Sequence, residues 1–241
     1  MLKDLPDKLE EHRYARFGEE QRKLYDAQVA HMQRTLSEAE PGEKLKVLAE
    51  LTKIREICCD PSLVAENYRG GSAKREACLD LIKRAVDVDH RLLLFSQVTS
   101  MLALLEEDLG KEGIPYYKIT GSTPKEERLR LVHAFNGDST PVFLISLKAG
   151  GTGLNLTGAD VVIHYDPWWN LAAENQASDR AHRIGQTKKV TVYKLIAKGT
   201  VEEKIVKLQE AKQNLSDSVV QAGGNPLAAL TQEELMDLLG V

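Results

Sequence analysis

The stretch from Val142 to Gln186 decides the fold of this chain. It opens with the apolar run Val142-Phe143-Leu144-Ile145-Ser146 and continues into the glycine-rich turn Lys148-Ala-Gly-Gly-Thr-Gly-Leu-Asn155. A second apolar run covers Val161–Tyr165. Where a strand feeds a glycine-rich turn that starts a helix, backbone N–H groups and the helix dipole favour an anion. The pattern predicts buried strands and a phosphate-binding turn.

The same stretch closes with Asn175-Gln-Ala-Ser-Asp-Arg-Ala-His-Arg-Ile-Gly-Gln186. On a helix, Gln176, Arg180 and Arg183 lie at i, i+4 and i+7 and therefore share one face. Two guanidinium groups beside an amide donor suit a polyphosphate, because guanidinium binds phosphate oxygens through two parallel hydrogen bonds. The alternative is a solvated helix that carries an i, i+4 ion pair between Asp179 and Arg183.

Three segments together resemble helicase motifs V and VI of the SWI/SNF family of DNA-translocating ATPases. They are Ser146–Leu156, Tyr165-Asp-Pro-Trp-Trp-Asn170 and Gln176–Gln186. One departure is Leu171, where the family usually has Pro, a residue suited to the first helical position. The resemblance implies the second RecA-like lobe of such an enzyme, of the bacterial type.

The resemblance also implies the roles of individual residues. Arg180 and Arg183 match the family's paired arginine fingers and are the expected catalytic residues. The expected nucleotide-binding residues are Gly151, Gly153, Gln176, Arg180 and Arg183. The expected DNA-binding residues are Ser96, Gln97, Gly121, Ser122, Lys148, Thr152, Asn155 and Trp169. We expect the glycine-rich turn to connect the two sites, since it faces DNA and abuts the arginines.

Several of these residues have a second interpretation. Ser96-Gln97 and Gly121-Ser122 follow two predicted strands, at the sheet edge where ligands bind in open α/β folds. Serine and threonine at such turns are also common helix caps, so both roles stay open. Trp169 is implied to touch the DNA minor groove, and Trp168 is the better core candidate. The alternative is that both rings are core.

Two nucleotide motifs are missing from the chain. It has no Gly-x-x-x-x-Gly-Lys-Ser/Thr loop for a nucleotide and no Asp-Glu-x-His motif for magnesium. The family carries both on its first lobe. We therefore expect ATP and Mg2+ to be held mainly by a first lobe that is absent here, and we expect no metal site in this chain.

Composition excludes several other classes of protein. The 241 residues are 42% hydrophobic and 28% charged, with a net charge of −4, so any nucleic-acid contact must come from a local patch. One such patch is 180–207, with eight Lys or Arg residues against two acids. Three cysteines without a Cys-x-x-Cys pair argue against disulfides and zinc. No signal peptide or membrane span is visible. We expect a cytoplasmic, nucleoid-associated protein.

Three segments are expected along the chain. Residues 1–66 are charged and predicted to be helical, with helices over Glu19–Leu36 and Glu43–Cys58, and resemble the linker between the family's two lobes; a generic helical hairpin would show the same pattern. Residues 67–221 alternate apolar strands with helices, which predicts a parallel sheet covered on both faces. Residues 222–241 are expected to form a flexible joint and a short helix that starts at Thr231.

The leading interpretation is the second motor lobe of an ATP-dependent double-stranded DNA translocase. Its partners would be duplex DNA, the first lobe of the same protein and a DNA-bound protein complex. One alternative is the same lobe of a bacterial ATPase that recycles RNA polymerase. Another is a non-catalytic α/β DNA-binding module, which intact arginines at 180 and 183 disfavour. A free-standing nucleotide enzyme is the weakest alternative, because the nucleotide loop is missing.

The missing motifs generate a first prediction. The purified chain should hydrolyse no ATP, with or without duplex DNA, because it supplies arginines but neither the nucleotide loop nor the magnesium carboxylate. Phosphate release by the purified chain is the measurement. DNA-stimulated release that persists in Arg183→Ala would contradict the prediction.

Overall fold

The computed structural model describes residues 6–38, 44–147, 149, 153–215 and 237–239. These residues group into two compact units. The first unit contains residues 1–14, 75–166 and 172–196, and the second contains 15–74, 167–171 and 197–241. In the described chain the elements run in the order β1 (Lys8–Ala15), α1 (Glu19–Glu38), α2 (Lys44–Cys59), η1 (Pro61–Leu63), α3 (Ala73–Asp87), β2 (Leu92–Ser96), α4 (Thr99–Lys111), β3 (Tyr116–Ile119), α5 (Lys125–Gly137), β4 (Val142–Ser146), β5 (Val161–His164), α6 (Leu171–Ser178), β6 (Val190–Ala197) and α7 (Val201–Leu215).

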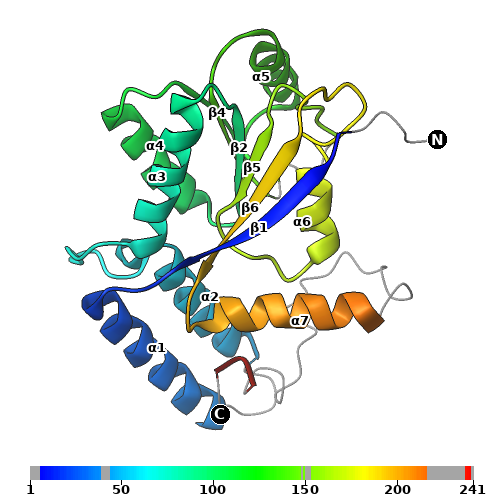
Figure 1. The fold of residues 1–241 in the computed structure, drawn as a ribbon. Coiled ribbons are helices and arrows are strands. Elements are labelled where there is room, and N and C mark those ends of the chain that lie inside the picture. Colours follow the sequence, from blue (N-terminus) through cyan, green and yellow to red (C-terminus); the bar gives the residue numbers. More distant parts are fainter. Residues whose placement is uncertain (1–5, 39–43, 148, 150–152, 216–236, 240–241) are drawn as a thin grey trace. The chain divides into compact units, whose positions relative to one another are not determined.

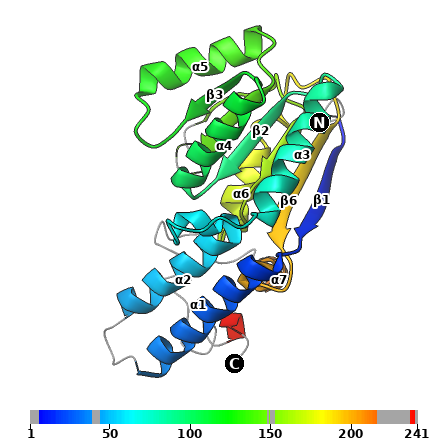
Figure 2. The same ribbon diagram turned by 90° about the vertical axis from the view of Figure 1, so that its left-hand side faces the viewer.

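The first unit is built on a parallel sheet. Its described strands lie in the order β1-β6-β5-β2-β4-β3, and Figure 1 shows α3 and α4 on one side of the sheet and α6 on the other. Figure 2, turned by 90°, places α3 and α4 in front of β2 and α6 behind. The central strands β2, β4 and β5 are buried along their whole length. Their continuous apolar sequences are typical of parallel strands covered on both faces. The fold is thus the predicted RecA-like α/β class.

The register of the central strands brings their carboxyl ends to one edge. Leu93 of β2 is opposite Phe143 of β4 and Val162 of β5. Ser96, the last residue of β2, pairs with Ser146, the last residue of β4. The loops that follow these strands therefore start from the same edge of the sheet.

Strand β1 corrects the prediction that residues 1–66 are helical throughout. Its sequence, Lys8-Leu-Glu-Glu-His-Arg-Tyr-Ala15, is charged and mostly outside the core. Backbone bonds from Val190 N–H to the Asp7 carbonyl (3.2 Å) and from Lys198 N–H to the Ala15 carbonyl (2.8 Å) hold it parallel to β6. An edge strand needs no apolar face, and charged residues on an edge discourage further pairing. Sequence periodicity therefore carried no signal for this strand.

The second unit is helical in its described part. Helices α1 and α2 pack on each other, and α2 also contacts α7. Their shared core includes Met32, Leu51, Ile54 and Ile205, all fully buried. Residues 237–239 are helical, with Leu238 and Leu239 buried in the same core. The expected joint at 222–226 and the helix start at Thr231 lie outside the described residues.

Cys58, Cys59 and Cys78 are all fully buried. Burial raises the pKa of the Cys58 thiol, and the nearby Glu202 carboxylate raises it further, so this thiol stays protonated. No helix among the described residues combines the length and apolarity that a membrane crossing requires.

The second unit contains a fully buried ion pair. Lys74 Nζ and Glu202 Oε1 are 2.6 Å apart, and both side chains are fully buried. Glu202 also accepts the Ala197 N–H through Oε2 at 2.7 Å. Breaking a buried pair leaves an uncompensated charge, which costs more than the intact pair contributes.

This pair generates a prediction for stability. Lys74→Met should lower the free energy of unfolding by about 3–5 kcal/mol, because Glu202 stays buried without its cation. Urea unfolding followed by circular dichroism measures the change. The matched control is Lys23→Met, which breaks an exposed pair with Glu19 in the same unit and should cost less than about 1 kcal/mol. Equal losses in the two variants would contradict the prediction.

Candidate functional site: an arginine-lined cavity beside helix α6

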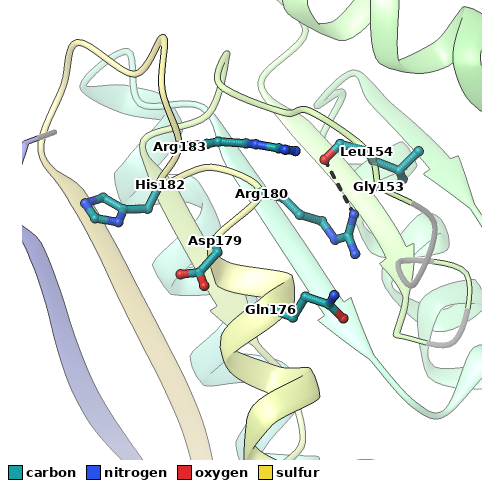
Figure 3. A pocket seen from close by; sticks show the side chains of 7 residues that line it. All are labelled: Gly153, Leu154, Gln176, Asp179, Arg180, His182 and Arg183. Atoms are coloured by element: carbon teal, nitrogen blue, oxygen red, sulfur yellow. Dashed lines mark hydrogen bonds between the residues drawn. The ribbon is translucent and has the colours of Figure 1, made fainter. Parts of the chain in front are cut away.

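A cavity of about 450 Å³ opens beside the end of α6. Its lining residues come from the loop after β4 and from the segment that begins in α6, and they are Gly153, Leu154, Gln176, Asp179, Arg180, His182 and Arg183. Figure 3 shows the side chains of Arg180 and Arg183 running in the same direction, toward Gly153 and Leu154, whereas His182 points the other way. The cavity therefore collects Gln176 and both arginines.

The predicted arginine helix is shorter than its spacing indicated. Helix α6 ends at Ser178, so Gln176 is helical whereas Arg180 and Arg183 lie in the turn that follows. The Arg180 carbonyl accepts the Leu156 N–H at 3.0 Å, and the Ala181 carbonyl accepts the Gln186 amide at 3.0 Å. These bonds occupy carbonyls that would accept helical N–H groups if α6 continued. The prediction of one continuous helical face is wrong, although the three side chains still reach one cavity.

Arg180 is the most constrained group in this cavity. It is 4% exposed, and its Nη1 donates to the Leu154 carbonyl at 3.4 Å. Its Nε is buried and has no hydrogen-bond partner. Burial lowers the pKa of Arg180, and the positive charge of Arg183 lowers it further. A buried, incompletely bonded cation next to a second cation is a site where an anion is stabilising.

The other polar residues of the cavity reach solvent. Gln176 and Arg183 are exposed. Asp179 lies 3.4 Å from Lys8 Nζ of β1, and its ion pair is with that lysine. The alternative interpretation, a surface helix that carries an Asp179–Arg183 pair, is therefore wrong. The Arg183 guanidinium stays available to a ligand.

Polar contacts, as well as apolar ones, hold α6 on the sheet. Ser178 Oγ and His164 Nε2 of β5 are 2.8 Å apart, both in buried residues. Glu174, also buried, pairs with Lys194 of β6 at 3.0 Å, and Lys194 in turn lies 3.2 Å from Glu10 of β1. Burial lowers the pKa of His164, which favours its neutral form. These contacts position the helix that leads into the arginine turn.

The glycine-rich turn is described only in part. Lys148, Gly151 and Thr152 lie outside the described residues. Gly153 has φ +56°, a left-handed conformation that favours glycine, and Asn155 is exposed. From 153 to 160 the chain is irregular or turned, so the helix expected after this turn does not begin there.

A side chain that sequence reasoning missed holds the loop around Asn155. Asn136 of α5 donates to the Asn155 carbonyl at 2.8 Å and accepts the Gly158 N–H at 3.0 Å. The only sequence signal for this role is a polar residue in the last turn of a helix that precedes a strand.

Ser96 and Gln97 are organised by an aspartate that the sequence analysis did not select. Ser96 is 1% exposed, and its hydroxyl donates to Asp166 Oδ1 at 2.6 Å. The Gln97 N–H donates to the same oxygen at 3.2 Å, and the Val98 N–H donates to Ser96 Oγ at 3.1 Å. Ser96 is therefore an internal contact of this edge, and Gln97 is the partly exposed member of the two.

Gly121 and Ser122 form an exposed turn after β3. Thr120 Oγ1 and Ser122 Oγ are 2.9 Å apart, and Thr123 Oγ1 accepts the Thr120 N–H at 3.0 Å. Arg128 of α5 donates to the Gly121 carbonyl at 3.0 Å. The hydroxyls thus bond within the turn and do not cap α5, whose first turn receives no side-chain cap. Ser122 remains on the surface.

The two tryptophans belong to the helical unit, and both are partly buried. Trp169 packs against the core of that unit, with the Arg55 guanidinium 5.9 Å from its ring centre. Its indole Nε1 is buried without a hydrogen-bond partner. The prediction that Trp168 is the better core candidate is therefore wrong, because the Trp169 ring supplies the core contact.

The basic window at 180–207 carries fewer free cations than its sequence indicated. Lys194 is occupied by Glu174 and Glu10, and Lys188 lies 3.2 Å from Asp160. Desolvation acts to lower the pKa of Lys194, but the two carboxylates outweigh it and the pKa is raised. A count of charges along the sequence does not register such internal pairing.

Comparison with known proteins adds an independent finding. Residues 73–185 match the family described as helicase conserved C-terminal domain. The chain is 40% identical to the putative ATP-dependent helicase/translocase YwqA of Bacillus subtilis, over 98% of this chain and 26% of that protein. It is 37% identical to an uncharacterized ATP-dependent helicase of Mycoplasma pneumoniae, over 99% of this chain and 23% of that protein. The chain thus spans about a quarter of the length of these relatives.

Two solved structures from Sulfolobus solfataricus are similar to the chain. One is a SWI2/SNF2 ATPase C-terminal domain, with a TM-score of 0.77 and 30% identity, covering 96% of this chain and 98% of that one. The other is a SWI2/SNF2 ATPase core in complex with dsDNA, with a TM-score of 0.80 and 31% identity, covering 99% of this chain and 51% of that one.

Proposed function

The chain belongs to the SWI2/SNF2 family of ATP-dependent helicases, and from this membership we propose that it is the second motor lobe of a double-stranded DNA translocase. The observation that carries the proposal is the cavity in which Arg180 and Arg183 converge. The proposal covers the role of the lobe within a larger enzyme, where a first lobe holds ATP and Mg2+.

The residues of the cavity fit a polyphosphate. Arg180 offers a buried Nε without a partner, Arg183 offers an exposed guanidinium, and Gln176 adds an amide. An anion placed among them would accept a hydrogen bond from the unpaired Arg180 Nε–H and offset the repulsion between the two guanidinium charges. In ATP-driven motors, arginines supplied from outside the nucleotide loop stabilise the charge of the transition state, with effects of roughly 10³–10⁵ in rate.

We propose different roles for Arg183 and Arg180, because one is exposed and the other is buried. When the lobes close, Arg183 would reach the γ-phosphate directly because it is exposed. Arg180 would stay anchored through Leu154 and present its remaining N–H groups. Mg2+ would supply charge neutralisation on the phosphate oxygens from the first lobe. We assign this chain no magnesium ligand.

DNA contacts are the second part of the proposal. We propose that Gln97, Gly121, Ser122 and Asn155 approach the phosphate backbone, since all four are at least partly exposed in loops of the α/β unit. Small side chains and backbone N–H groups suit phosphate contacts that do not depend on sequence. The complex of a related core with dsDNA supports duplex DNA as the partner. We propose that the enzyme works in the cytoplasm, on the bacterial nucleoid.

Arginine variants test the catalytic part of the proposal. In a protein that contains both lobes, Arg183→Ala and Arg180→Ala should each lower DNA-stimulated turnover by about 10³ or more while ATP and DNA affinity stay nearly intact. Arginine→Lys should do little better, because a point charge cannot reproduce the planar fork. Steady-state ATPase rates with and without duplex DNA measure the effect.

The matched control for these variants is Arg34→Ala, which removes an exposed arginine from α1 and should leave turnover unchanged. Unfolding midpoints show whether the buried Arg180 also stabilises the fold. Normal turnover in Arg183→Ala would overturn the proposed function.

DNA binding by the chain alone gives a separate prediction. Binding should be weak and independent of sequence, and the logarithm of the binding constant should fall linearly with the logarithm of the salt concentration. The slope should be shallow, because Lys188 and Lys194 are already paired. Fluorescence anisotropy with two duplexes of unrelated sequence measures both properties. Binding that survives high salt, or that differs strongly between the duplexes, would contradict the prediction.

A further inference from the structure

The side chain of Gln186 joins two segments of the candidate site. It is 6% exposed, and its Nε2 donates toward the carbonyls of Thr157 (3.2 Å), Ala159 (2.7 Å) and Ala181 (3.0 Å). Its Oε1 accepts the N–H groups of Thr187 and Lys188, both at 2.9 Å. Because carbonyl oxygens surround one end of the side-chain amide and N–H groups the other, the first end must be the nitrogen and the second the oxygen.

These contacts bracket the arginine turn. The Gln186 amide holds the Ala181 carbonyl, two residues before Arg183, and the Gln186 N–H bonds the Arg183 carbonyl at 2.9 Å. The turn is also tied to the loop after β4 by the Leu156 N–H, which donates to the Arg180 carbonyl. Arg183 itself is exposed, so the direction of its side chain depends on the backbone that Gln186 holds.

The two hydrogens of the Gln186 NH2 are shared among the three carbonyls, and its oxygen accepts both N–H groups. A glutamate would place a carboxylate against three carbonyl oxygens, and a lysine has no acceptor for the two N–H groups. A methionine of similar length could not donate to the three carbonyls. The chemistry of the site therefore specifies glutamine, although Gln186 does not line the cavity.

We propose that Gln186 positions Arg183 by tying the arginine turn to the loop 157–159. This inference rests on the proposed function, since it assigns the placement of a side chain that acts on ATP. A misplacement on the order of 1 Å in a catalytic group lowers rates by about 100-fold. Loss of the amide should therefore reduce turnover more than substrate binding.

The first experiment compares Gln186→Met with Gln21→Met in a protein containing both lobes. Gln21 is the matched control: it is 1% exposed in the helical unit, donates to the Ile57 carbonyl at 3.0 Å and accepts the Ala73 N–H at 3.2 Å. Both variants lose a buried amide clamp. Gln186→Met should lower DNA-stimulated kcat by about 10-fold or more with KM for ATP within about two-fold. Gln21→Met should lower the unfolding midpoint and keep kcat.

A pH profile provides a readout that a purely structural role would not change. In Gln186→Glu the new carboxyl is buried against carbonyl oxygens, so its pKa is raised. Below that pKa it is protonated and again donates a hydrogen bond; above it the carboxylate repels the carbonyls. The kcat of Gln186→Glu relative to wild type should rise as pH falls from 8 to 6. Gln186→Met should show no such rise.

The outcomes separate this inference from the proposed function. Full kcat in Gln186→Met, with Arg183→Ala inactive, would overturn the positioning role and leave the lobe's function standing. Normal turnover in Arg183→Ala would overturn the proposed function itself. If both Gln186 variants fail to fold while Gln21→Met and Gln21→Glu fold, the positioning role is also overturned, because the fold as a whole would then require Gln186.

Discussion

Parallel pairing of three fully buried strands is the constraint on which the α/β unit depends. Each of β2, β4 and β5 is apolar except for its last residue, and each is hydrogen-bonded on both sides in the described sheet. Parallel strands bring all carboxyl ends to one edge, and loops with polar groups must leave from there. The Ser96–Asp166 contact lies at that edge. The arginine turn lies by the amino ends of the strands, where Asp179 contacts Lys8 of β1 and the Gln186 side chain donates to the Ala159 carbonyl just before β5.

Desolvation gives the arginine cavity its chemistry. Arg180 is largely removed from water, lacks a partner for Nε and lies near a second cation, so three unfavourable terms act on one guanidinium. Such a group costs free energy in the isolated lobe and is relieved by an anion. The exposed Arg183 carries no comparable burial cost, because it stays in water until a ligand arrives. The two arginines are therefore physically distinct even though the sequence presents them as a pair.

The helical unit combines an apolar core with a buried ion pair. Helices α1, α2 and α7 bury an apolar core, and the Lys74–Glu202 pair is fully buried in the same unit. A buried ion pair contributes little net stability but penalises arrangements that separate its charges. The Trp169 ring packs on the core of this unit, and its buried indole N–H has no hydrogen-bond partner.

The sequence by itself determined the class of fold, because continuous apolar runs such as Val142–Ser146 are unambiguous where a strand is buried on both faces. It also determined which residue types meet at the cavity, since Gln176, Arg180 and Arg183 are close along the chain. Only the tertiary structure decided that β1 is a strand, that α6 ends at Ser178 and that Gln186 links the turn to residues 157–159. Those features depend on hydrogen bonds between segments far apart in sequence, and such bonds leave no periodic pattern for sequence analysis to read.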